Sequence, residues 1–444
     1  MRLLHILKRL PVYLKSIALL TLLRPVAAIL RRTSGDYRHL WLVMERGFDA
    51  RDNGYWFFRY LREQQPQVNA CFVIDPSSPD CEKAAQLGRT IRWRSMKHYL
   101  AYLAADMLIG THVQPAAPEL VPFYHLRQIG IRPRGKQVFL QHGIIMNRMK
   151  MMTYPGLKLD FFASGGRMEY DYLVSEYGFP EGVIRYTGLC RYDNLLRGNR
   201  PSDEILVMPT WRGSDYPRGE QFYGTAFYRH FQSLLENPRL IRLLEERNLR
   251  LVFYPHIELQ EELDKFSSPS DRVIPASWRD YDVQTLLMRC RMLITDYSSV
   301  SFDVGYMEKP VIYYQFDPED FRKYHYQEGY FSAEKHGFGP VAGTEEALVD
   351  AVYECAGNDF RMQEEYRKHL EAFFPVRDEK NCERTYQILS RMSGGQQETV
   401  IRRGTGGIGK DASCAAFRQQ YGTCGNRNHA DELLPGDGPG PDSV

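Results

Sequence analysis

Short apolar runs alternate along the first half of this chain with segments of helical spacing. Apolar runs at 40–44, 70–74 and 107–110 are separated by segments 55–63 and 97–106, in which apolar residues recur every third or fourth position. Strands that alternate with helices in this way form a parallel sheet covered by helices. The pattern therefore predicts an α/β domain in the first half of the chain.

The same alternation starts again after residue 200. Strand-like runs at 204–208 and 249–254 flank a helical region, 227–247, which Asn237 and Pro238 interrupt. This repetition predicts an α/β protein with two Rossmann-like domains and a ligand-binding cleft between them. We expect an N-terminal segment over 1–35, a first domain over 36–197, a second domain over 198–393 and a disordered tail over 394–444, where Gly, Gln, Asn, Asp and Pro replace the apolar periodicity.

The stretch 292–314 reads as strand, polar turn, helix and strand. Its first apolar run ends in Thr295 and Asp296, and Ser298 and Ser299 then begin an amphipathic segment. Backbone N–H groups at the start of a helix, together with the positive end of the helix dipole, favour a phosphate group. An ordinary N-cap, in which a serine only begins a helix, gives the same pattern.

The first 32 residues contain seven Lys and Arg residues and no acidic one. Their longest uncharged run, 16–23, is much shorter than the roughly 20 residues that span a bilayer. Arg24 and Pro25 interrupt the apolar stretch, which is not typical of a secretory signal. We interpret the segment as a basic amphipathic helix on an anionic, cytoplasmic membrane surface. The alternative is an N-terminal helix packed on the first domain.

Charge and cysteine content exclude several classes of protein. The 444 residues have a net charge of +2 and a pI near 8.0, so no nucleic-acid partner is expected. The eight cysteines are scattered without the spacing of a zinc site, which favours a reducing compartment. We expect neither a metal ion nor a cofactor other than a donor substrate.

Two histidines follow strand-like runs in different halves of the chain. His142 precedes a glycine and His256 follows a proline. Near neutral pH, a histidine can accept the proton of an attacking alcohol, or it can stay positive and hold a phosphate. A structural hydrogen bond at a strand end is the alternative for each of them. Asp193 and Asp296 are candidates to orient such a histidine or to accept substrate hydroxyls.

Arginines at strand ends add to this set. Arg212 follows Thr210 and can bind phosphate oxygens with two parallel hydrogen bonds, although an ion pair is the alternative. Arg191 stands two residues before Asp193, after the run that begins at residue 184. Together these residues suit transfer from a nucleotide donor with a diphosphate link, because such transfer needs positioning and charge neutralisation above all.

Short motifs follow one another in order along the chain: Glu45-Arg-Gly-Phe-Asp-Ala-Arg-Asp-Asn-Gly, Gln141-His-Gly, Gly188-Leu-Cys-Arg-Tyr-Asp, Pro209-Thr-Trp-Arg, Tyr254-Pro-His and Thr295-Asp-Tyr-Ser-Ser-Val-Ser-Phe-Asp. This ordered set resembles the CDP-glycerol glycerophosphotransferase family of teichoic acid and related polymer synthesis, from about residue 40 to 389. The resemblance implies a GT-B-like pair of Rossmann domains and transfer of glycerol phosphate, or a related polyol phosphate, from a CDP-activated donor. It also implies a growing, lipid-linked acceptor and peripheral attachment to the cytoplasmic face of the cell membrane.

Carried over by motif, His142 resembles the base on the acceptor side and His256 a partner of the donor phosphate. The turn from Thr295 to Ser299 resembles the donor diphosphate site. The chain has Gln141-His-Gly-Ile-Ile where many members have Trp-His-Gly-Thr-Pro, Cys190-Arg-Tyr-Asp where they have Pro-Arg-x-Asp, and Arg212-Gly where they have Arg-Asp. The first two differences leave the acceptor open, and the third weakens any role for an acid after Arg212.

Two other functions fit the same patterns. A GT-B glycosyltransferase that uses a sugar nucleotide has the same architecture, and a membrane adaptor without catalytic activity needs neither histidine. The sequence does not distinguish which polyol or sugar phosphate is transferred, or whether one unit or many are added.

Overall fold

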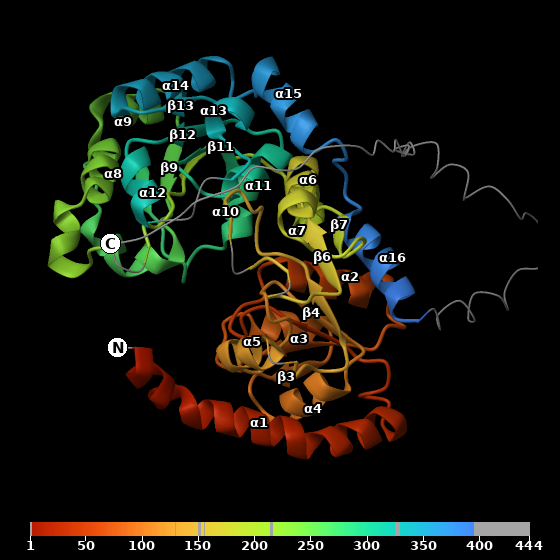
Figure 1. Ribbon diagram of the computed structural model, residues 1–444. Helices are drawn as coiled ribbons and strands as arrows, with labels where there is room; N and C mark the ends of the chain where they lie inside the picture. Colours follow the sequence, from red (N-terminus) through yellow and green to blue (C-terminus); the bar gives the residue numbers. More distant parts are fainter. Residues whose placement is uncertain are drawn as a thin grey trace, which may run out of the picture. The chain divides into compact units, whose positions relative to one another are not determined.

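Each half of the chain forms its own parallel sheet (Figure 1). The computed structural model describes residues 2–394, except for 129, 150, 151, 155, 214, 215 and 325–328. The tail predicted over 394–444 lies outside the described residues, apart from Gly394.

The first sheet has seven strands in the order β3-β2-β1-β4-β5-β6-β7, and all of its pairings are parallel. Its chain order reverses between β1 and β4, which makes this the switch point where ligands of such sheets bind. The strands are β1 (Trp41–Met44), β2 (Ala70–Ile74), β3 (Thr90–Arg92), β4 (Met107–Gly110), β5 (Lys136–Phe139), β6 (Phe161–Ser164) and β7 (Ile184–Tyr186).

Helices cover both faces of this sheet, so the strands β1, β2, β4 and β6 are buried on both sides. Alternate residues of β1 reach opposite faces: Trp41 and Val43 pack in one core cluster, and Leu42 and Met44 pack in another. The helices are α2 (Asn53–Gln64), α3 (Cys81–Leu87), α4 (Met96–Ala104), α5 (Leu120–Gln128), α6 (Arg167–Glu176) and α7 (Arg191–Gly198).

The second sheet repeats this topology with six parallel strands in the order β10-β9-β8-β11-β12-β13. Its order reverses between β8 and β11. The prediction of two Rossmann-like domains in a GT-B-like arrangement is therefore confirmed. The strands are β8 (Glu204–Val207), β9 (Arg250–Phe253), β10 (Val273–Pro275), β11 (Cys290–Thr295), β12 (Val311–Tyr314) and β13 (Val341–Ala342).

In the second half of the chain, the predicted break between two helices lies at Asn237. The side chain of Asn237 accepts the backbone N–H groups of Arg239 and Leu240 at 3.0 and 3.1 Å, and Pro238 occupies the first turn of the new helix. The helical segments of this half are η2 (Gly219–Gly224), α8 (Ala226–Glu236), α9 (Pro238–Glu246), η3 (Ile257–Lys265), α10 (Val283–Arg289), α11 (Val300–Tyr306), α12 (Pro318–Tyr324), α13 (Ala333–His336), α14 (Glu345–Gly357) and α15 (Glu364–Phe373).

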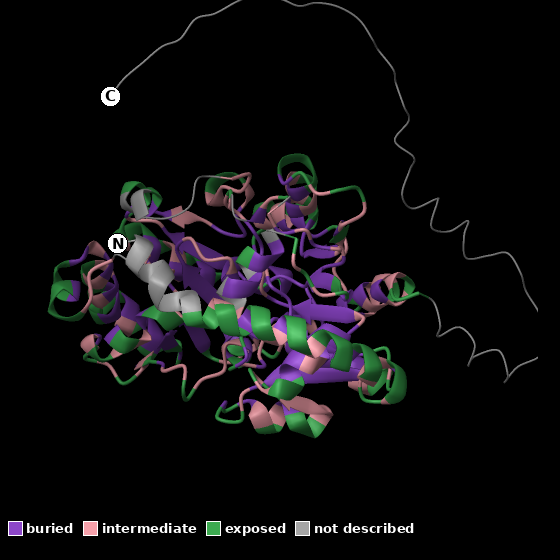
Figure 2. Ribbon diagram, turned by 60° about the horizontal axis from the view of Figure 1, so that its bottom comes forward, coloured by how far each residue is buried: buried purple, intermediate pink, exposed green. Residues whose placement is uncertain are grey.

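Helix α1 (Arg2–Thr33) packs along α4 and α5. Leu20 and Ala27 are buried against the first domain, whereas Leu14, Leu22 and Ile29 on the opposite side are 59, 70 and 60% exposed (Figure 2). The helix thus has a packed face and an exposed apolar face. By length and composition, with a mean hydropathy of 1.6, its stretch Pro11–Thr33 can cross a membrane. The uncharged run 16–23 alone is too short to span a bilayer, so it did not predict this property of the longer stretch.

The last helix, α16 (Asn381–Met392), leaves the second half of the chain and packs on α2 and α7 (Figure 1). Asp193 holds it there: one carboxylate oxygen accepts the backbone N–H of Asn381 at 2.8 Å, and the other accepts that of Cys382 at 2.9 Å. The predicted domain ranges placed α16 in the second domain, 198–393, whereas the helix packs on helices of the first domain. The ranges themselves stay a prediction.

We expect Asp193→Ala to destabilise the protein. Two backbone N–H groups would lose a buried acceptor, which costs about 1–3 kcal/mol. The free energy of unfolding in urea measures this cost, and Asp171→Ala, in an exposed ion pair with Arg167, is a control that hardly changes it. Equal stability of Asp193→Ala and the unaltered protein would contradict the anchoring role.

Candidate active site

A cavity of about 900 Å³ lies at the carboxyl ends of both sheets. Residues that follow β1, β4 and β5 line one side of it, and residues that follow β8, β9 and β11 line the other. Both switch points therefore open into one cleft, as expected for a substrate site shared by two Rossmann-like domains.

His142 faces this cleft and is bound to an aspartate that the sequence analysis did not single out. Its Nδ1 lies 2.5 Å from Oδ2 of Asp52, and 64% of the His142 side chain is exposed. Asp52 begins α2, where its other oxygen accepts the N–H of Asn53 at 2.8 Å. A carboxylate on Nδ1 holds the proton there and leaves Nε2 able to accept one. This is the arrangement of a general base.

Asp52 stays ionised in this setting. Burial alone would raise its pKa, but the charges of His142 and Arg191 and its hydrogen bonds lower the pKa of the carboxyl to about 2. The carboxylate is therefore negative at neutral pH and stabilises the imidazolium that forms when His142 accepts a proton.

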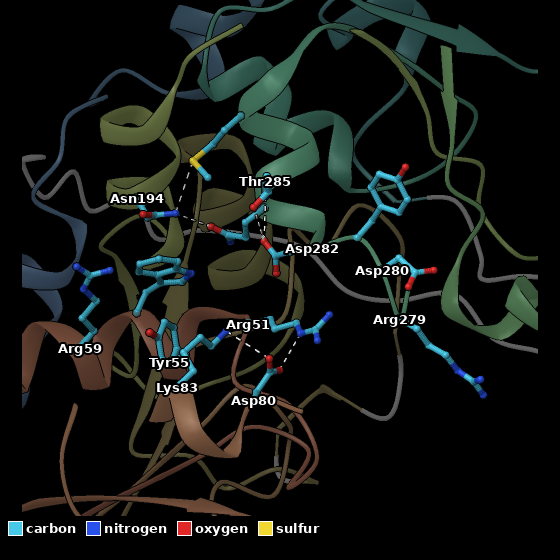
Figure 3. A pocket seen from close by; sticks show the side chains of 14 residues that line it. Arg51, Tyr55, Arg59, Asp80, Lys83, Asn194, Arg279, Asp280, Asp282 and Thr285 are labelled. Atoms are coloured by element: carbon cyan, nitrogen blue, oxygen red, sulfur yellow. Dashed lines mark hydrogen bonds and ion pairs between the residues drawn. The ribbon is translucent and has the colours of Figure 1, made fainter. Parts of the chain in front are cut away.

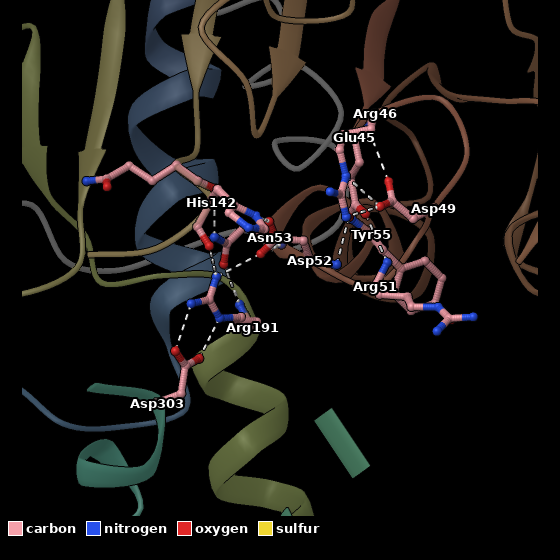
Figure 4. Close-up of polar contacts among 11 residues, drawn as sticks. Glu45, Arg46, Asp49, Arg51, Asp52, Asn53, Tyr55, His142, Arg191 and Asp303 are labelled. Carbon is pink, nitrogen blue, oxygen red and sulfur yellow. Dashed lines mark hydrogen bonds and ion pairs between the residues drawn. The ribbon is translucent and has the colours of Figure 1, made fainter. Parts of the chain in front are cut away.

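Arg191 connects Asp52 to the second domain (Figure 4). Its Nε and NH2 bind the two oxygens of Asp303 at 2.5 and 2.8 Å, and its NH1 binds Asp52 at 2.7 Å. NH1 also donates to the backbone oxygen of His142. Burial alone would lower the pKa of Arg191, but Asp303 raises it well above its usual value. Arg191 lines the cleft, yet the protein itself occupies its donors, so it positions the predicted base rather than a substrate.

Two further residues, Glu45 before α2 and Asn53 at its start, fix this geometry. The Glu45 carboxylate accepts the backbone N–H groups of residues 51, 52 and 55 at 2.9, 2.9 and 2.7 Å. Asn53 donates to the backbone oxygen of Gln141 at 2.9 Å and accepts the N–H of Arg191 at 3.0 Å. It thereby ties the loops after β1, β5 and β7 together. In the sequence, Asp52 was recognisable only as an aspartate close before a helical segment, within the first family motif.

His256 lies in the same cleft, but its Nδ1 accepts a hydrogen bond, whereas Nδ1 of His142 donates one to Asp52. Its Nδ1 accepts the backbone N–H of Glu258 at 3.2 Å, and its ring stacks on Trp211 with 5.9 Å between ring centres. Because Nδ1 is an acceptor, the proton of the neutral ring is on Nε2. His256 is thus arranged as a donor, which suits a phosphate oxygen.

Three of the other predicted donor-side residues also line the cleft: Thr210, Ser298 and Ser299. The Oγ1 of Thr210 is buried without a hydrogen-bond partner among the described residues, and Ser299 begins α11 without a side-chain cap bond. An unpartnered buried hydroxyl in a cleft is a candidate to bind a ligand. Helix α11 has only seven residues, so the cleft-facing hydroxyls matter more here than its dipole.

Arg212, Thr295 and Asp296 are buried and hold loops together instead. NH1 of Arg212 lies 2.7 Å from Asp296, and Nε and NH2 bind Asp317 at 2.8 and 3.1 Å. The Thr295 hydroxyl donates to the backbone of Met208 at 2.6 Å. Arg212 is 1% exposed and its charge is compensated by two carboxylates, which agrees with the alternative of an ion pair. Its contact with phosphate stays a prediction. Asp193, which lies on α7 and binds α16, is not among the residues that line the cleft.

The arginines that do line the cleft are all paired. NH2 of Arg46 lies 2.5 Å from Asp49, and Nε of Arg51 lies 2.7 Å from Asp80. We expect hydroxyls, backbone N–H groups and His256 to contribute to phosphate binding beside these paired arginines. Arg51 and Asp80 also border a smaller cavity of about 490 Å³, which Lys83, Arg279 and Asp282 help to line (Figure 3).

No group of three or more His, Cys, Asp or Glu side chains suited to a metal ion occurs in the part of the chain that the structure describes. That no metal or cofactor takes part remains a prediction.

Comparison with known proteins identifies the family. Residues 26–391 match the CDP-Glycerol:Poly(glycerophosphate) glycerophosphotransferase family. The chain belongs to this family. Among curated glycerophosphotransferase relatives it is 30% identical over 366 residues to the minor teichoic acid biosynthesis protein GgaB of Bacillus subtilis, covering 79% of this chain and 39% of GgaB. It is 27% identical over 370 residues to the teichoic acid poly(glycerol phosphate) polymerase of the same organism, covering 75% of this chain and 46% of the polymerase. The chain therefore spans less than half the length of either relative.

Solved structures agree on the fold. The wall teichoic acid polymerase TagF superposes with a TM-score of 0.61 at 18% identity, over 88% of this chain and 99% of the TagF chain. The S. aureus MnaA-UDP structure superposes with a TM-score of 0.51 at 13% identity, over 79% of this chain and 96% of that one. At these identities the likeness concerns the fold alone.

We expect Arg212→Met to destabilise the second domain rather than to act on a ligand. The change leaves Asp296 and Asp317 buried without their cation, at a cost of about 3–5 kcal/mol. Urea unfolding measures the loss, and Arg239→Met, in the exposed ion pair with Asp350, is the matched control that changes stability little. A stable Arg212→Met protein with weakened donor binding would restore the original interpretation.

Proposed function

We propose that this chain transfers glycerol phosphate, or a related polyol phosphate, from a CDP-activated donor to a hydroxyl of a growing polymer and releases CMP. Membership of the glycerophosphotransferase family supports this, as does the TagF structure obtained after soaking with CDPG. The observation that carries the proposal is the cleft itself, where His142, paired with Asp52, and His256 come from different domains.

The chemistry follows from the hydrogen bonds of the two histidines. The acceptor hydroxyl oxygen attacks the phosphorus that carries the glycerol, and a new P–O bond forms. The bond from this phosphorus to the oxygen that bridges to CMP breaks, and CMP leaves with the electron pair. Nε2 of His142 takes the hydroxyl proton, and Asp52 stabilises the resulting imidazolium. His256, Thr210, Ser298 and Ser299 bind the phosphate oxygens of the donor.

Incubation with CDP-glycerol and a lipid or oligo(glycerol phosphate) primer should release CMP. His142→Ala should lower kcat about a hundredfold or more, because the general base is lost. Asp52→Asn should lower kcat by about tenfold or more while donor binding persists, because it removes the negative charge that orients and stabilises the imidazolium.

His230→Gln is the matched control, since this histidine of the second domain binds Tyr314 at 3.1 Å and does not line the cleft. Its turnover should stay near that of the unaltered protein. Release of UDP from UDP-sugars, without CMP from CDP-glycerol, would favour a glycosyltransferase. Full turnover by His142→Ala would contradict the assigned base.

We further propose peripheral attachment to the cytoplasmic membrane face, where a lipid-linked acceptor is found. The support is the outer face of α1, with Leu14, Leu22 and Ile29 exposed, next to basic residues that suit anionic lipids. A helix packed on its domain by one face can rest on a membrane with the other.

Replacing Leu14, Leu22 and Ile29 together by Gln should weaken binding to vesicles of anionic phosphatidylglycerol about tenfold or more, because three apolar side chains no longer leave water. Binding of the unaltered protein should weaken with salt. Sedimentation with vesicles measures both. Met96→Gln with Val174→Gln, which removes exposed apolar side chains elsewhere, is the matched control. Unchanged binding of the α1 variant would contradict the proposal.

A further inference from the structure

A third histidine lies at the centre of the cleft and has no role in the chemistry described above. His112 follows β4 by two residues, at the switch point between β1 and β4, and lines the cavity. Its ring centre is 6.2 Å from that of His142, and the two planes are tilted by 38°. The two imidazole rings are therefore neighbours in the cleft.

The ring nitrogens of His112 have no hydrogen-bond or ion-pair partner within the described residues, although the side chain is partly buried. His98, in the same domain, shows the usual arrangement. Its Nδ1 accepts the N–H of Arg94 at 3.2 Å, and its Nε2 lies 3.0 Å from the backbone oxygen of Ala116. An imidazole left open beside the predicted base is therefore available to a substrate.

His112 is uncharged at neutral pH. Burial lowers its pKa to about 4, and the neighbouring His142 and Arg46 act in the same direction, against the opposite effect of Asp52 and Asp49. A neutral imidazole has one donor and one acceptor. It matches a hydroxyl group, which can both accept and donate, better than it matches a phosphate oxygen.

We infer that His112 binds the hydroxyl next to the one that attacks, so that the acceptor presents two neighbouring hydroxyls to His112 and His142. The inference rests on the proposed transfer to a polyol acceptor and names the part of that acceptor which is recognised. The terminal unit of the acceptor is then a vicinal diol, such as a glycerol end. Its primary hydroxyl binds His142, and its secondary hydroxyl binds His112.

Two primers test this with CDP-glycerol as donor. One ends in glycerol phosphate, and the other ends in propane-1,3-diol phosphate, which lacks only the secondary hydroxyl. With the unaltered protein, loss of this hydroxyl should lower kcat/KM about tenfold or more, because His112 loses its partner. With His112→Phe, the two primers should react at nearly equal rates, since neither then has a partner at that position.

His112→Asn keeps a donor and an acceptor and should restore part of the preference for the diol primer. If His112→Phe fails to fold, the primer preference of His112→Asn still tests the inference. His98→Gln is the matched control: it should lower the midpoint of thermal unfolding and leave the preference between primers unchanged. A purely structural role of His112 predicts the same loss with both primers.

The outcomes separate the two proposals. If His112→Phe or His112→Asn loses kcat/KM equally with both primers, the recognition of a vicinal diol is overturned, and the transfer stands. If the unaltered protein reacts equally well with both primers, the inference fails in the same way. Absence of CMP release with either primer overturns the proposed transfer, and the inference with it.

Discussion

The buried guanidinium of Arg191 is the interaction on which the cleft depends. It lies between Asp303 of α11 and Asp52 before α2, so each domain supplies one of its carboxylates. Removing either carboxylate would leave a buried charge without its full compensation, which is among the more costly changes in a protein interior. The contact therefore favours one arrangement of the two domains. Because Asp52 also holds His142, the orientation of the predicted base depends on a helix of the other domain, which directly follows the serines assigned to the donor.

The three histidines of the cleft differ in their hydrogen bonds rather than in their residue type. Asp52 on Nδ1 makes His142 an acceptor at Nε2, whereas the N–H of Glu258 on Nδ1 makes His256 a donor there. His112 has neither partner and is held neutral by burial. In the proposed roles, the environment distinguishes a base, a phosphate ligand and a hydroxyl ligand among three side chains of one kind.

Local signals in the sequence were sufficient for the architecture. Apolar runs predicted most strands to within one or two residues, and Asn237 with Pro238 marked the break between two helices. The strands β3, β10 and β13, with three residues or fewer, are too short to show a period. The roles of charged residues were harder to predict because their partners are distant in sequence. Arg212 pairs with Asp317 and Asp193 with residues 381 and 382, and both therefore resembled free ligands. For the same reason, the link from Asp52 to His142, 90 positions away, could not be predicted.

Helix α7 explains how the two domains stay in register around the cleft. It carries Arg191 at its start and Asp193 two residues later. Arg191 binds α11 of the second domain, and Asp193 holds α16, where the chain returns from the second domain to the first. The chain also leaves the first domain at the end of α7. Both crossings and the buried ion pair therefore converge on one short helix. The contacts that position His142 and the chain connections between the two domains thus share a single element, so a change at α7 would affect the cleft and the domain junction together.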